Sequence, residues 1–141
     1  MAERPAEDPR LAEKKGVRIL LIDDVPSARK VVRKLLGFLG FENVVEAASG
    51  AEALSLSQAD SFELIVSDFH LSDMGADGLI TKIRESESMG TVPVLIVTGD
   101  TAAKVYHSVS GEENVLYMWK PFGVKDLQDK LVAALSPEVL D

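Results

Sequence analysis

Five positions with chemically active side chains stand at or just beyond the ends of apolar runs in this chain. They are Asp23, Asp24, Asp68, Thr98 and Lys120, the last of which is followed by a proline. Each apolar run is typical of a buried strand, and parallel strands bring their carboxyl ends to one edge of a sheet. Three carboxylates there would attract a hard cation, whereas a hydroxyl and an ammonium could contact an anion. The pattern therefore indicates a site for a divalent cation beside a phosphoryl group.

Each of these residues also has an ordinary structural interpretation when it is taken alone. An Asp pair before Pro26 is typical of a helix start, and Asp68 could cap a helix. Thr98 could be a β-branched strand residue, and Lys120 could be one of many surface lysines. The whole set favours the chemical interpretation, because carboxylates ~4 Å apart repel by roughly 1 to 4 kcal/mol per pair unless a cation relieves them.

The elements that must position these side chains alternate along the chain. The predicted strands are VRILLID (17–23), NVVEA (43–47), ELIVSD (63–68), PVLIVTG (93–99) and NVLYMWK (114–120). The predicted helices are 26–39, GAEALSLSQA (50–59), 78–84, TAAKVYHSV (101–109) and 124–135, the last ending near Ser136. Such alternation predicts an α/β fold with a parallel sheet and right-handed crossovers. The continuous apolarity of the fourth strand predicts helices on both faces.

The helix after the first strand has a clear amphipathic pattern. Pro26 is suited to open it and Gly40 to close it. The apolar residues predicted to share its buried face are Ala28, Val31, Val32, Leu35 and Leu39.

Length and composition exclude several classes of protein. The 141 residues suit one domain, and 46% apolar residues are too many for wholesale disorder. A net charge of -8 without a segregated basic patch disfavours nucleic acid as a direct partner. The absence of cysteine excludes disulfides and thiolate metal sites. Because no run approaches the ~20 apolar residues of a membrane span and no signal peptide is evident, we expect a cytoplasmic protein.

The segments LLIDDVPSARKVVRKLLGFLGF, ELIVSDFHLSDM, VLIVTG and YMWKPF together resemble a response-regulator receiver domain, and most closely the stand-alone chemotaxis type. The resemblance spans roughly Val17 to Leu135. It implies a flavodoxin-like, doubly wound, five-stranded parallel sheet of order 2-1-3-4-5. We accordingly expect a receiver domain over 17–136, a flexible amino-terminal tail over 1–16, which is poor in apolar residues, and a short tail over 137–141.

The resemblance also implies a role for each residue of the acidic cluster. Asp68 would be the phosphoacceptor, whose carboxylate attacks a phosphoryl group carried on a kinase histidine. One Mg²⁺ ion would be bound directly by Asp24 and Asp68, through water by Asp23, and by the main-chain carbonyl of His70. Phosphoryl transfer depends mainly on alignment and charge neutralisation, so few other groups are required.

A second group of implied roles concerns the phosphoryl group and the response to it. Lys120 would neutralise charge, its ammonium directed inward by a cis bond to Pro121. The Thr98 hydroxyl would bind a phosphoryl oxygen, and Gly99 would leave space and offer an N–H. Tyr117 is the expected switch aromatic, although a half-buried packing role is equally compatible with its position. Its movement with Thr98 would alter the face of the fourth helix, fifth strand and fifth helix.

The segment after Asp68 departs from the family pattern, which usually has Met-Pro and then Asp-Gly. Ser72 stands at the proline position, and an ungapped alignment places Gly75 and Ala76 where Asp-Gly is usual. Aligning Asp77-Gly78 instead would require an insertion, so we prefer the ungapped alignment.

His70, two residues after the phosphoacceptor, is the most individual choice near the site. It could be an ordinary surface histidine. Our hypothesis is that His70 and Asp100 flank the approach of water to the acyl phosphate and thereby tune its hydrolysis.

The sequence thus predicts a two-component phosphorelay response regulator that is no enzyme beyond its own phosphorylation and dephosphorylation. Its partners would be a sensor histidine kinase or phosphotransfer protein and a downstream protein, for which a flagellar motor switch is a candidate. The domain could equally be excised from a multidomain regulator or hybrid kinase. A phosphatase of the haloacid dehalogenase type would need a second Asp at position 70, which is His, and an interaction module with a dead site would not need all five chemical positions filled.

Overall fold

The computed structural model describes residues 8–99 and 114–136. Its sheet contains β1 (Ile19–Ile22), β2 (Val44–Ala47), β3 (Leu64–Asp68), β4 (Val94–Thr98) and β5 (Val115–Trp119). All neighbouring strands pair in parallel, in the order β2-β1-β3-β4-β5. This order confirms the flavodoxin-like fold that the resemblance implied.

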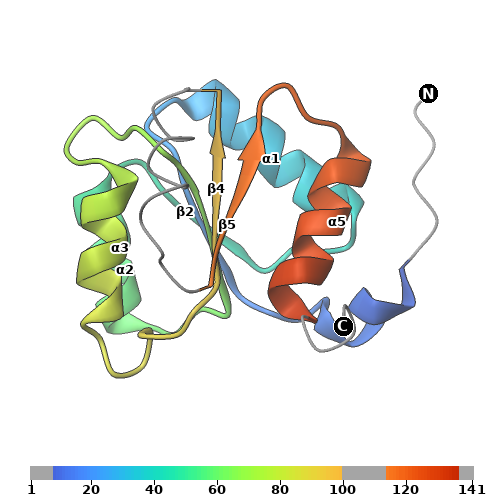
Figure 1. Cartoon of the computed structure of the whole chain (residues 1–141), viewed down its shortest axis with the longest axis horizontal. Coiled ribbons are helices and arrows are strands. Elements are labelled where there is room, and N and C mark those ends of the chain that lie inside the picture. The colour runs from blue at the N-terminus through green and yellow to red at the C-terminus, as the bar shows by residue number, and fades with distance from the viewer. Residues whose placement is uncertain (1–7, 100–113, 137–141) are drawn as a thin grey trace.

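Helices cover both faces of the sheet, as predicted. They are α1 (Pro26–Phe38), α2 (Gly50–Ala59), α3 (Ala76–Arg84) and α5 (Val124–Leu135). Figure 1 shows α2 and α3 on one side of the strands, and α1 and α5 on the other. The helix predicted at 101–109 lies outside the described residues. None of the described helices is both long and apolar enough to cross a membrane.

The strands divide their side chains between two apolar cores, because successive residues of a strand point to opposite faces. Leu20 and Ile22 pack with residues of α2 and α3, whereas Ile19 and Leu21 pack with residues of α1 and α5. All four are fully or almost fully buried. Burial on both faces explains why the strands are nearly continuous apolar runs.

The predicted buried face of α1 is partly wrong. Val31 is 55% exposed, whereas Leu36, which the prediction omitted, is completely buried. The core residues Val32, Leu36 and Leu39 follow the i, i+4, i+7 spacing of one helical stripe. Val31 precedes Val32 by about 100° around the helix, and this offset turns its side chain away from the buried stripe.

The amino terminus also differs from the prediction of a flexible tail over 1–16. Residues Pro9–Lys14 form a 3₁₀ helix, η1, which lies beside the end of α5 in Figure 1. Leu11 is 1% exposed within the core that α1 and α5 cover. The Ser136 hydroxyl donates to the Arg10 carbonyl at 2.8 Å. One leucine among polar residues was too weak a signal to predict this docking.

One helix boundary is earlier than predicted. We expected the third helix to begin at Gly78, but α3 begins at Ala76, whose amide donates to the Phe69 carbonyl at 2.8 Å. The helix therefore starts close to the end of β3. Residues 137–141, the predicted carboxyl-terminal tail, lie outside the described residues.

Candidate functional site

The sheet brings the chemically active residues to one edge. β1 ends at Ile22, which pairs with Ser67, so Asp23 and Asp68 follow at the same level on adjacent strands. Asp68 in turn pairs with Val97, one residue before Thr98. The carboxyl ends of β1, β3 and β4 therefore converge, as the sequence predicted.

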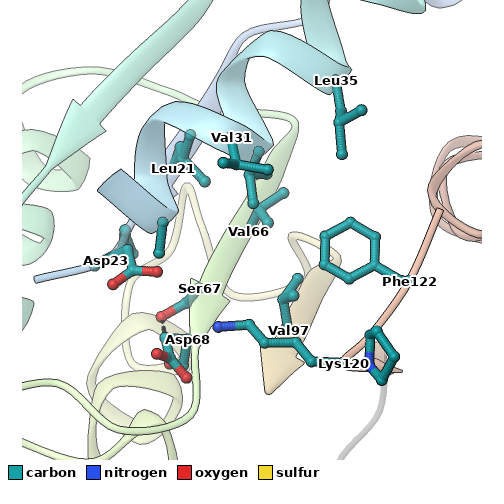
Figure 2. Close-up of a pocket in the computed structure, with 14 residues that line it drawn as sticks. Leu21, Asp23, Val31, Leu35, Val66, Ser67, Asp68, Val97, Lys120 and Phe122 are labelled. Carbon is teal, nitrogen blue, oxygen red and sulfur yellow. Dashed lines mark hydrogen bonds between the residues drawn. The ribbon is translucent and has the colours of Figure 1, made fainter. Parts of the chain in front are cut away.

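The side chains of Asp23, Asp68 and Lys120 line one open cavity of about 370 Å³. Figure 2 shows the Lys120 ammonium directed toward Asp68, with Asp23 on the other side of the cavity. Ser67 also lines the cavity, and its hydroxyl donates to the Asp68 carbonyl at 2.9 Å. Two carboxylates and one ammonium thus share a confined space.

Asp23 is the most buried carboxylate of the site, with 5% of its surface exposed. Burial raises its pKa, and the negative charges of Asp68 and Asp24 raise it further. The Val25 amide, which donates to Oδ1 at 2.9 Å, and the Lys120 ammonium act in the opposite direction. Burial next to two other negative charges thus disfavours the charged form of Asp23, which a bound cation would stabilise.

Asp24 does not join the other two carboxylates in the cavity. It is half-buried and is not among the residues that line this space. Among residues 8–99 and 114–136, no group of three His, Cys, Asp or Glu side chains is placed to hold a metal ion. The structure therefore brings Asp23 and Asp68 together but does not assemble the predicted set of three.

Mg²⁺ nevertheless fits this arrangement, because it is usually bound by one or two carboxylates and retains several water molecules. The buried carboxylate of Asp23, repelled by Asp68, is the observation that favours a cation here. The chain's own ligands would be these two carboxylates. Asp24 and the His70 carbonyl, which the resemblance also implies as ligands, do not line the cavity.

Sequence reasoning missed Arg29, which supports the acidic turn from α1. Its Nη1 donates to the Asp23 carbonyl at 2.6 Å, and its Nε donates to Glu46 at 2.7 Å. Glu46 also pairs with Arg33, and the hydrogen bond from Arg29 is the main reason that the pKa of Glu46 is lowered. Only the register that pairs Leu21 with Glu46 reveals this network.

Lys120 and its neighbours agree with the implied arrangement. The Lys120–Pro121 peptide is cis, as the resemblance implied. The Lys120 amide donates to the carbonyl of Thr98, a buried residue, at 3.0 Å. A Cβ at Gly99 would lie 3.6 Å from the Lys120 Cβ, an ordinary contact, so the described neighbours do not by themselves require glycine there.

Tyr117 is buried within the sheet rather than half-buried at the surface. Its ring stacks on Trp119 with centroids 5.7 Å apart and planes at 16°. It pairs with Ile96 in β4, two residues before Thr98. Its proposed role as a switch stays a prediction. Asp100, the other residue proposed to tune hydrolysis, lies outside the described residues.

His70 lies on the exposed surface next to the site. Its ring meets Phe69 edge to face, with centroids 5.0 Å apart. Its backbone forms an antiparallel bridge with Gly75, which closes the loop between β3 and α3.

Comparison with known proteins shows the family to which this fold belongs. Residues 19–132 match the family of the response regulator receiver domain, so the chain belongs to that family. The chain is 32% identical over 117 residues to chemotaxis protein CheY-3 of Vibrio cholerae, covering 83% of this chain and 90% of that protein. It is 30% identical over 116 residues to chemotaxis protein CheY of Pseudomonas aeruginosa, covering 82% and 93%. The chain is thus a receiver domain of two-component signalling.

Solved structures lead to the same family. The structure of CheY4 of Vibrio cholerae superposes with a TM-score of 0.75 and 28% identity, covering 84% of this chain and 98% of that one. The receiver domain of a sensor histidine kinase from Pseudomonas aeruginosa superposes with a TM-score of 0.74 and 26% identity, covering 84% and 97%. That second structure contains a magnesium ion coordinated in its active site cleft.

Proposed function

We propose that this receiver accepts a phosphoryl group on Asp68 from the phosphohistidine of a sensor kinase or phosphotransfer protein. A carboxylate oxygen of Asp68 attacks phosphorus while the bond from phosphorus to the histidine nitrogen breaks, and the imidazole leaves with that electron pair. The observation that carries the proposal is that Asp68 shares one cavity with Lys120 and the buried Asp23.

The surrounding residues supply charge and hydrogen bonds to the incoming group. The Lys120 ammonium neutralises the developing charge on the phosphoryl oxygens. The Thr98 hydroxyl and the Gly99 amide bind those oxygens. One Mg²⁺, when bound by Asp23 and Asp68 with Asp24 and the His70 carbonyl, offsets the negative charge of carboxylate and phosphate.

The chain's chemistry is limited to its own phosphorylation and dephosphorylation. His70 stands exposed two residues after the acceptor, where its side chain can influence the approach of water to the acyl phosphate. Asp100, which lies outside the described residues, is the second residue proposed to tune hydrolysis. Replacing His70 by Asn tests this role: an unchanged rate of acyl-phosphate hydrolysis would exclude it.

The signal passes to a protein partner when Thr98 and Tyr117 respond to the phosphoryl group. The surface proposed to change comprises β5 and α5, together with the predicted fourth helix at 101–109, which lies outside the described residues. A switch must bind its partner better in one state. We expect Tyr117→Ala to abolish the difference in partner affinity between the phosphorylated and unphosphorylated protein, and an undiminished difference would contradict the switch.

The phosphodonor docks on α1, where the cavity opens. Val25 and Val31 are 48% and 55% exposed at this surface, and Val31 lines the cavity with Ala28 and Leu35. Lys30 and Lys34, which are one turn apart, are also exposed on α1, and the helix contains no acidic residue. Apolar contact surrounded by positive charge suits an acidic phosphodonor helix.

The names of the chemotaxis relatives suggest the pathway. We propose a flagellar motor switch as the downstream target, and the cytoplasm as the compartment. Direct binding of nucleic acid is not part of the proposal, because the net charge is -8.

Phosphorylation at a single residue is the decisive experiment. The purified chain is incubated with Mg²⁺ and a radiolabelled phosphohistidine protein, and peptide mass spectrometry then locates the added phosphate. We expect label on Asp68 and none in Asp68→Asn, whereas Asp77→Asn, which removes an exposed carboxylate of α3, serves as the matched control. Label on another residue, or a response of Asp68→Asn to beryllofluoride, would refute the proposal.

A further inference from the structure

The loop between β3 and α3 is closed by its own backbone. His70 and Gly75 form an antiparallel bridge, and the Leu71 amide donates to the Met74 carbonyl at 3.2 Å. The Ala76 amide then donates to the Phe69 carbonyl at 2.8 Å. The loop therefore returns on itself directly after the phosphoacceptor strand.

Asp73, at the tip of this loop, is bonded to a different element. Its Oδ1 accepts from the Gly50 amide and its Oδ2 accepts from the Ala51 amide, each at 2.9 Å. These amides belong to the first turn of α2, more than twenty residues earlier in the chain. These two hydrogen bonds are also the largest causes that lower the pKa of Asp73, so the carboxylate is charged at neutral pH.

The first turn of α2 depends on this external carboxylate. The first amides of a helix lack partners within the helix and must be satisfied from outside. Ser49, the N-cap, accepts from the Glu52 amide at 3.0 Å, and the Glu52 side chain accepts from the Ala48 amide, just before the N-cap, at 2.7 Å. The amides of Gly50 and Ala51, the first two residues after the N-cap, are those bonded to Asp73.

A second contact joins the loop to the same turn. A Cβ at Gly50 would lie 2.5 Å from the Cγ of Met74 and 2.6 Å from its Sδ. The Met74 side chain therefore packs in the space that a larger residue at position 50 would take for its own side chain, and such a residue would displace it. Asp73 and Met74 together attach the loop to α2 through a polar and an apolar contact.

We propose that Asp73 is a positioning residue that sets the Mg²⁺ affinity of the site by holding the loop that carries the His70 carbonyl. The inference rests on the proposed function, because it concerns the same metal. It also gives a role to the unusual sequence of this loop: Ser72 leaves φ unrestrained where proline would restrict it, and the hydrogen bonds from α2 restrain the next residue instead.

The test compares the metal affinity of variants without using phosphorylation as the readout. Amide shifts of ¹⁵N-labelled protein, titrated with MgCl₂, give the dissociation constant for Mg²⁺. We expect Asp73→Ala to raise this dissociation constant by about tenfold, the lower end of the loss that follows when a group that orients a metal ligand is removed. Asp73→Asn keeps one acceptor oxygen but no charge, so its Mg²⁺ dissociation constant should lie between those of the unsubstituted chain and Asp73→Ala. Hydrogen exchange of the Gly50 and Ala51 amides should accelerate in both variants.

The matched control is Glu87→Ala, which removes an exposed carboxylate from the segment between α3 and β4. Its Mg²⁺ dissociation constant should not change. A merely structural Asp73 would shift the urea midpoint and leave the Mg²⁺ affinity of the folded protein unaltered, and that result would overturn the inference. If Asp73→Ala does not fold, Asp73→Asn decides alone. If the unsubstituted chain shows no Mg²⁺ binding, the proposed function itself fails, and this inference fails with it.

Discussion

Replacing Asp23 by Asn should stabilise the metal-free protein, although it removes a residue of the site. The carboxylate is 5% exposed, and its pKa is raised by burial and by the charges of Asp68 and Asp24. An amide of nearly the same shape removes the charge but keeps an oxygen to accept from the Val25 amide, which now donates at 2.9 Å. The substitution therefore isolates the energetic effect of the buried charge.

The size of the gain follows from opposing electrostatic effects. Two carboxylates ~4 Å apart repel by roughly 1 kcal/mol in water and about 4 kcal/mol at an effective dielectric constant near 20. Attraction between Asp23 and Lys120 offsets part of this repulsion, and Asn loses that attraction. We expect a net increase of about 1 to 2 kcal/mol in the free energy of unfolding at pH 7.

The gain should depend on pH in a definite direction. Because the pKa of Asp23 is raised in the folded protein, the folded state binds this proton more tightly than the unfolded state. The destabilisation is complete above the folded pKa and fades as the pH falls through that pKa toward the ordinary value of 3.8. The difference between Asp23→Asn and the unsubstituted chain should therefore shrink on acidification.

Urea unfolding followed by far-ultraviolet circular dichroism measures this effect, at pH 7 and about pH 4, in the presence of a chelator. Glu87→Gln is the control for loss of one exposed negative charge. Saturating Mg²⁺ should reduce or reverse the gain, because only the unsubstituted site has both carboxylates to bind the ion. Equal or lower stability of Asp23→Asn at pH 7 without metal would refute the reasoning.

Three further predictions test other contacts. Leu11→Ala should lower the free energy of unfolding by at least about 2 kcal/mol in urea, because Leu11 is a fully packed core residue; a smaller loss would restore the interpretation of a tail. Arg29→Gln should cost about 1 kcal/mol through its lost bonds to Asp23 and Glu46, and a double-mutant cycle with Glu46→Gln should show coupling; additive effects would contradict the network. Ala28→Leu should fill part of the cavity and slow transfer from a phosphotransfer protein more than transfer from a small phosphodonor; equal slowing in stopped-flow assays would place the docking elsewhere.

Much of the architecture followed from sequence pattern and resemblance. The apolar runs predicted all five described strands, and the residues at their ends predicted that Asp23, Asp68 and Lys120 would meet, although Asp24 does not line their cavity. The strand order came from the resemblance, because periodicity cannot choose among doubly wound sheets. The error on α1 arose because Val31 and Val32 are both apolar, and only packing decides which of two adjacent residues is buried.

Other features depend on contacts between distant segments. Arg29 reaches Glu46 across seventeen residues, and Asp73 reaches Gly50 across twenty-three. Neither pair has a local signal, because a hydrogen bond between elements depends on the register and on the orientation of both. The same limit explains why the sequence did not reveal that Asp23 lines the cavity and Asp24 does not.

The sequence by itself determined the chemical character of this receiver: an acidic pair, a central aspartate, a hydroxyl and an ammonium, each placed after an apolar run. Side-chain type and strand spacing are local properties, so they can be recognised before folding is considered. Only the tertiary structure decided which carboxylate is buried, which arginine supports it and which loop is attached to α2. Those outcomes depend on burial and on distances between elements, which exist only once the sheet and its helices have packed.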